Sequence, residues 1–135
     1  MKIGCDVLQV ERITSIIKSE KVFSKSEIDY AMKFKNFEEH FAGFFCAKEA
    51  FIKAIDLPLK DRFPLSDISI CHKDNGRPYI VLLGKAKEII GEINCDLSIS
   101  HSKDVAMAVV LLISAECEVE KNKKHDLNIV FFVLH

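Results

Sequence analysis

The chain has 135 residues, of which 19 are basic and 20 acidic, and its formal net charge is −1. This length fits one domain, and the balanced charge lacks the basic excess of proteins that hold nucleic acid through its phosphates. Five cysteines, odd in number and without a C-x-x-C pair, argue against a disulfide framework and a zinc knuckle. We find no signal segment at the N-terminus and no run near the roughly 20 apolar residues of a membrane span. We therefore expect a cytoplasmic protein with neither nucleic acid nor membrane as its partner.

The first predicted elements are a strand over residues 2–10 and helical pieces over residues 10–35. In the strand, Asp6 lies on the opposite side from Ile3. Ser24 and Ser26 are both plausible N-caps of the second helical piece. Basic residues punctuate this region, and on charge alone a solvated surface is the simpler interpretation. They are Arg12, Lys18, Lys21, Lys25, Lys33 and Lys35.

A longer helix is predicted over residues 38–55, ending at Asp56 and Pro58. Its expected apolar stripe contains Phe41, Phe45, Ile52 and Ile55. Glu49 lies beside this stripe, and a buried carboxylate needs a partner. Two interpretations are open. On spacing alone the simpler one is an ion pair with Lys53, four residues later. In the other, Glu49 holds a cation.

After a loop over residues 57–67, the sequence DISICHK-DNGRP-YIVLL predicts a β-hairpin. Asn75 and Gly76 are expected to supply two positive-φ positions in its turn. A short helix, GKAKEIIGEI, and two strands, LSISH and VAMAVVLLI, follow. The last strand is apolar on both faces and is expected to be central. The result is a single α+β domain over residues 1–114, with residues 115–135 as an atypical extension that is not a separate domain.

Two carboxylates, Asp6 and Glu49, would suit a hard divalent cation such as Mg²⁺, with other coordination positions left for water and substrate phosphates. No glycine-rich phosphate loop, no G-x-S-x-G and no zinc-hydrolase histidine spacing occurs. Phosphate chemistry would therefore depend on the metal and on lysines.

Four stretches, in order, resemble the motifs of the holo-acyl-carrier-protein synthases, the small single-domain 4′-phosphopantetheinyl transferases. They are IGCDVLQVERI, FAGFFCAKEAFIKAI, NGRPYI and LSISH, and the resemblance runs from Ile3 to about Leu112. It implies a 4′-phosphopantetheinyl transferase-like fold, with an antiparallel sheet packed with helices. It also implies that the 4′-phosphopantetheine group of coenzyme A (CoA) is transferred to a serine of apo acyl carrier protein. The products would be holo acyl carrier protein, for fatty acid biosynthesis, and adenosine 3′,5′-bisphosphate.

The resemblance also implies roles for individual residues. Asp6 and Glu49 would be the Mg²⁺ ligands and, with Lys53, the catalytic set. Lys48 and His101 would contact CoA. The family's functional unit is a homotrimer with sites between protomers.

The resemblance places Arg12 at the surface that faces the acidic carrier protein, which gives the basic region a function. Where the family helix carries an arginine, this chain has Phe44. This departure keeps one alternative open, a non-catalytic homologue that binds CoA or acyl carrier protein without transfer.

Overall fold

The computed structural model describes residues 1–56 and 62–113, which form helices and two sheets around one apolar core. In chain order the elements are β1 (Lys2–Gln9), η1 (Val10–Arg12), α1 (Ile13–Ile17), α2 (Lys25–Ala31), α3 (Phe37–Ile55), η2 (Leu65–Asp67), β2 (Ile68–His72), β3 (Pro78–Leu82), α4 (Gly84–Ile90), β4 (Cys95–His101) and β5 (Val105–Leu112). Three sequence predictions lie outside the described residues: the first part of the loop (57–61), the end of the helix at Pro58, and the extension over residues 115–135.

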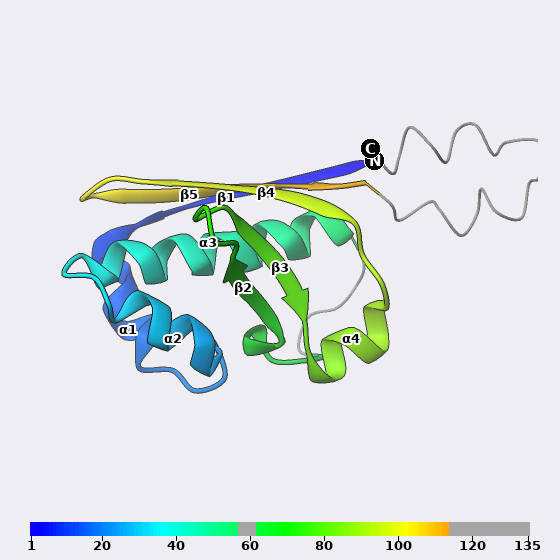
Figure 1. The fold of residues 1–135 in the computed structure, drawn as a ribbon, viewed down its shortest axis with the longest axis horizontal. Coiled ribbons are helices and arrows are strands. Elements are labelled where there is room, and N and C mark those ends of the chain that lie inside the picture. Colours follow the sequence, from blue (N-terminus) through cyan, green and yellow to red (C-terminus); the bar gives the residue numbers. More distant parts are fainter. Residues whose placement is uncertain (57–61, 114–135) are drawn as a thin grey trace, which may run out of the picture.

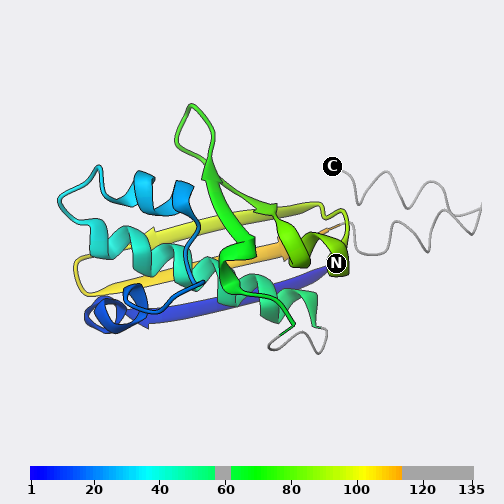
Figure 2. The same cartoon turned by 90° about the horizontal axis from the view of Figure 1, so that it is seen from below.

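Three strands form an antiparallel sheet in the order β1-β5-β4, and β2 and β3 form a separate antiparallel hairpin. The prediction that the last strand is central is confirmed, because β5 pairs with both β1 and β4. Helix α3 lies along one face of the three-stranded sheet, and the hairpin crosses the far side of that helix (Figure 1, Figure 2). The α+β architecture expected from the sequence is therefore confirmed. No helix of the described segments is long and apolar enough to cross a membrane.

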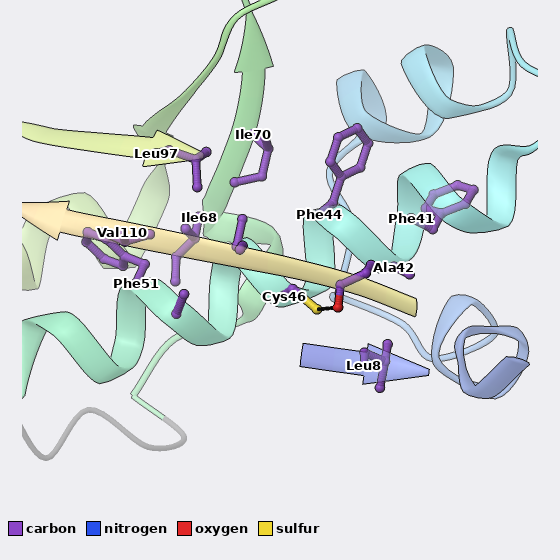
Figure 3. Close-up of a cluster of buried hydrophobic side chains, with 14 of the residues drawn as sticks. Leu8, Phe41, Ala42, Phe44, Cys46, Phe51, Ile68, Ile70, Leu97 and Val110 are labelled. Carbon is purple, nitrogen blue, oxygen red and sulfur yellow. Dashed lines mark hydrogen bonds between the residues drawn. The ribbon is translucent and has the colours of Figure 1, made fainter. Parts of the chain in front are cut away.

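Helix α3 is buried on more than one side because it lies between the sheet and the hairpin (Figure 3). The expected stripe is therefore wrong in part. Phe45 and Ile52 are only half-buried, whereas Phe44 and Phe51 are buried in the core. Towards the sheet, the helix approaches β1 so closely that a Cβ on Gly4 would lie 2.1 Å from the carbonyl oxygen of Ala50.

The hairpin turn differs from the prediction. Only Gly76 has a positive φ, of 89°, and Asn75 does not. The Gly76 amide donates to the Lys73 carbonyl oxygen at 2.8 Å, and the Lys73 amide donates to the Arg77 carbonyl oxygen at 2.9 Å. The connection is therefore a β-turn followed by a left-handed glycine, a three-residue loop that needs only one positive-φ residue.

Helix α2 begins with a reciprocal capping box, in which Ser24 rather than Ser26 is the N-cap. The Ser24 side chain accepts from the Glu27 amide, and the Glu27 carboxylate accepts from the Ser24 amide at 2.8 Å. This arrangement satisfies two amides at the helix start and turns the Glu27 side chain into the protein.

The outer face of the three-stranded sheet is not covered by any described element (Figure 1). Apolar side chains cover much of it on β1 and β5, where Ile3 is 68%, Val7 64%, Val105 40% and Met107 44% exposed. Val7 and Met107 are cross-strand neighbours. A contiguous exposed apolar patch of this kind is typical of an association surface.

Candidate active site

The carboxylate of Asp6 and the ammonium of Lys53 meet where β1 lies against α3. Side chains alternate along β1, and Asp6 is on the face that packs on the helix, as Gly4 and Leu8 are. The Lys53 Nζ donates to Asp6 Oδ1 at 3.2 Å and to the carbonyl oxygen of Cys5 at 3.0 Å. Lys53 thus pairs with Asp6. Within residues 1–56 and 62–113 it forms no ion pair with Glu49, so the simpler interpretation of the helical spacing is wrong.

Glu49 completes this group from the same helix, one turn before Lys53. Burial raises the pKa of the Glu49 carboxyl, the nearby charge of Asp6 raises it further, and Lys53 partly opposes both. The two carboxylates therefore carry more negative charge than one lysine offsets, and a cation would stabilise the ionised pair.

This donor set fits Mg²⁺ chemically. In the described parts of the chain, no group of three or more His, Cys, Asp or Glu side chains could hold a metal. An ion bound here would have two carboxylate ligands and would take its remaining ligands from water or substrate, as Mg²⁺ commonly does and structural Zn²⁺ does not.

Cys46, one turn before Glu49, lies behind Asp6 and was not predicted from the sequence to belong to the site. Burial raises the pKa of its thiol to about 12, with further contributions from the charge of Asp6 and a hydrogen bond to it. Its Sγ is also 3.5 Å from the carbonyl oxygen of Ala106 in β5 (Figure 3). The thiol is therefore protonated at neutral pH, next to the Asp6 carboxylate.

Lys48 does not belong to this group, although the resemblance implied that it contacts CoA. Its side chain is completely buried and forms an ion pair with Glu27 at 2.8 Å. Burial lowers the pKa of Lys48, and Glu27 opposes that change. The helix turns this ammonium towards α2 and β2 instead of towards Asp6, so the structure does not bring Lys48 to the carboxylate group.

His101 lies at the end of β4, where its Nδ1 is 2.8 Å from Glu39 Oε1. Glu39 precedes Glu49 by ten residues of α3, which places this pair roughly 15 Å away along the helix axis. The structure therefore does not bring His101 into contact with Asp6, Glu49 and Lys53. A ligand that touched both groups would extend along α3.

Two further histidines, His40 and His72, line a pocket of about 160 Å³ with His101. The rings of His40 and His101 are 5.1 Å apart, and His72 stacks on Tyr30 at 3.8 Å. Burial lowers the pKa of both His40 and His72, and neighbouring positive charge lowers each further. Sequence spacing could not group these histidines, because α3, β2 and β4 each contribute one.

Arg12 is exposed at the end of η1. A wider pocket of about 420 Å³ lies near this end of the sheet, and its lining includes Glu11, Glu38 and Asp104. Neither Asp6 nor Glu49 lines it, so this pocket does not coincide with the carboxylate pair.

Comparison with known proteins identifies the family of this chain. Residues 2–110 match the 4′-phosphopantetheinyl transferase superfamily. A holo-[acyl-carrier-protein] synthase of Caldanaerobacter subterraneus subsp. tengcongensis is 38% identical over 122 residues, covering 84% of this chain and 95% of that protein. One from Fusobacterium nucleatum is 34% identical over 119 residues, covering 82% and 97%.

Solved structures of holo-[acyl-carrier-protein] synthases resemble this chain in both fold and sequence. The Helicobacter pylori holo-[acyl-carrier-protein] synthase in complex with coenzyme A is 32% identical, with a TM-score of 0.68 and coverage of 82% of this chain and 98% of that one. The Bacillus anthracis synthase in complex with CoA (3′,5′-ADP) is 31% identical, with a TM-score of 0.68 and coverage of 82% and 94%. The family match covers β1 and α3, which carry the carboxylate group, and this chain belongs to the 4′-phosphopantetheinyl transferase superfamily, among the holo-[acyl-carrier-protein] synthases.

Proposed function

We propose that this protein transfers the 4′-phosphopantetheine group of CoA to a serine of apo acyl carrier protein, producing holo acyl carrier protein and adenosine 3′,5′-bisphosphate. The observation that carries the proposal is the meeting of Asp6, Glu49 and Lys53 on β1 and α3, inside the region matched to the superfamily. Two carboxylates and a lysine at one point suit a reaction on a pyrophosphate.

Asp6 and Glu49 would hold Mg²⁺, which the raised pKa of Glu49 supports, since the pair lacks a full counter-charge. When bound, the ion supplies positive charge that stabilises the pyrophosphate oxygens in the transition state. Lys53, more than half exposed and 3.2 Å from Asp6, supplies a second positive charge to the leaving phosphate.

In the reaction the serine oxygen attacks the phosphorus that carries the pantetheine arm. A new P–O bond forms, the bond to the adenosine bisphosphate breaks, and the serine proton is released. A water molecule, or one of the two carboxylates of Asp6 and Glu49, would accept this proton.

The distance between the two polar groups fits an extended substrate such as CoA. With its pyrophosphate at Asp6 and Glu49, CoA would reach along α3 towards the pocket of His101, His40 and His72. His101 then contacts CoA, as the resemblance implied. The buried Lys48 takes no part in this binding.

The partner surfaces follow from charge and exposure. Arg12 is exposed on η1, and Lys18 and Lys21 follow in the next segments, a surface that suits an acidic acyl carrier protein. The exposed apolar face of the three-stranded sheet supports self-association, and we propose a homotrimer. We further propose that the protein acts in fatty acid biosynthesis in the cytoplasm.

The test is the intact mass of apo acyl carrier protein after incubation with this protein, CoA and Mg²⁺, beside a reaction with EDTA. We expect a gain of one phosphopantetheine that requires the metal. Glu49→Gln should abolish it, and Glu88→Gln, at an exposed glutamate on α4, should not. No gain from a folded protein, with a carrier that another transferase modifies, would favour the non-catalytic homologue.

A further inference from the structure

We infer that the buried ion pair between Lys48 and Glu27 is a positioning device that holds α3 so that Glu49 faces Asp6. The inference rests on the proposed function, because it concerns how the same site is assembled. It assigns a role to two charged residues that the transfer reaction itself does not use.

The pair is built into the interior and is closed to ligands. Both side chains are completely buried, and Lys48 Nζ lies 2.8 Å from Glu27 Oε1. The ammonium also donates to the carbonyl oxygens of Leu65 and Ile68. A lysine ammonium has three N–H donors, and here each has a protein acceptor. None remains for a phosphate.

Glu27 is fixed equally well. Its Oε1 also accepts from the Ser24 amide at 2.8 Å, and its Oε2 accepts from the Ile70 amide at 2.7 Å. One ion pair therefore joins α3 to the start of α2, to η2 and to β2. These elements lie on the side of α3 away from the sheet (Figure 1, Figure 2).

The position of Lys48 in the sequence gives the pair its effect on the site. Neighbouring residues of a helix point about 100° apart, so Lys48 turns to the hairpin while Glu49 and Ala50 turn to β1. On the β1 side, the close approach of Gly4 to Ala50 sets the helix depth. On the other side, the ion pair sets its rotation. The carboxylate of Glu49 is held between these two constraints.

Energetics favour this role over a purely stabilising one. A buried ion pair often adds no stability over well-packed apolar residues of similar size, because both charges lose their hydration. Its hydrogen-bond geometry is nevertheless strict, so it specifies one arrangement of the joined elements. The pair is therefore better suited to fixing the helix than to strengthening the core.

The test uses the full chain with Lys48→Met and Glu27→Gln combined, which removes both charges and leaves an acceptor for the Ile70 amide. Three quantities are measured beside the wild type. They are kcat for transfer, the Kd for CoA by calorimetry in metal-free buffer, and the rise in Tm on adding Mg²⁺. We expect an intact fold by circular dichroism, a CoA affinity within twofold of the wild type, a kcat lowered at least tenfold and a smaller Mg²⁺-induced rise in Tm.

Glu27→Asp is a less disruptive second variant, since it keeps both charges and shortens the acidic side chain by one methylene. It should lower kcat and the Mg²⁺-induced rise in Tm by smaller amounts than the double variant. A Kd for CoA raised tenfold or more with an unchanged response to Mg²⁺ would make Lys48 a phosphate contact and overturn the inference. Unchanged kcat and metal response in both variants would also overturn it. An inactive wild type would instead count against the proposed function, whereas the Mg²⁺ response would still report on positioning.

Discussion

Replacing Gly4 by alanine should separate the two halves of the active site. The added Cβ would lie 2.1 Å from the Ala50 oxygen and 2.7 Å from the Ala54 nitrogen. Ordinary contacts lie near 3.5 Å, so β1 and α3 must move apart by more than about 1 Å. The clashing atoms are backbone atoms, and no side-chain rotation can relieve the overlap.

Two magnitudes follow. Overpacking a core costs about 1–3 kcal/mol, and with backbone on both sides we expect the upper end, about 3 kcal/mol of unfolding free energy. For a domain of this size that corresponds to a fall in Tm on the order of 10 °C. The same movement separates Glu49 from Asp6, and a 1 Å misplacement of reacting groups lowers kcat by on the order of 10²-fold.

Urea denaturation and the mass assay on acyl carrier protein measure the two effects separately. Gly43→Ala is the control for stability alone, because it adds the same methyl to α3 where only the Cγ2 methyl of Ile99 lies close, at 2.8 Å, and because Gly43 lines the histidine pocket. We expect its unfolding free energy to stay within about 1 kcal/mol of the wild type, since alanine also improves helix propensity. If Gly4→Ala matched the wild type in both stability and kcat, the close approach of strand and helix would not hold the site.

Three further predictions concern single side chains. Since burial and Asp6 raise the folded-state pKa of Glu49 above its ordinary value of 4.5, the metal-free unfolding free energy should fall as pH rises through that raised value. In Glu49→Gln this part of the fall should vanish in urea titrations across pH, and its persistence would assign it to another group. Cys46 in the native protein should resist iodoacetamide at pH 8, because its pKa is about 12, and should be labelled only after unfolding. The exposed Cys5 serves as the comparison, and protection of Cys5 that grows with protein concentration would show that self-association covers the sheet face. His101→Ala should raise the KM for CoA about tenfold with a smaller change in kcat. Glu39→Gln removes the carboxylate that orients the His101 ring and should raise the KM for CoA by a smaller factor. A fall in kcat with an unchanged KM would contradict a binding role for His101.

The sequence predicts those parts of the site that depend on local periodicity. Alternation along β1 shows that Asp6 and Ile3 point to opposite faces, and helical spacing places Glu49 beside an apolar stripe. Lys53 is different, because the helical pair with Glu49 is worth only about 0.2–0.5 kcal/mol. A contact across the fold, to Asp6 and the Cys5 carbonyl, outweighs that preference.

Other features depend on which elements the fold brings together. The burial of Lys48 requires Glu27, 21 residues earlier, and carbonyl groups that follow α3. Helical spacing alone cannot show that α3 is covered on two sides. The turn at Asn75 and Gly76 is ambiguous for another reason, since the same pair suits both a two-residue turn and the three-residue loop that forms.

The pairing of β1 with β5 has a consequence for the order in which the chain can fold. Lys2 at one end of the sheet pairs with Leu112, so the first strand made is joined to the last described strand. During synthesis β1 remains unpaired until β5, the last described strand of the domain, has been made. Such long-range pairing slows folding, because much of the loop-closure entropy is lost before the contacts form. Helix α3 can form earlier, and we expect its side towards β1, including Ala50, to remain exposed until the strands pair and complete the site.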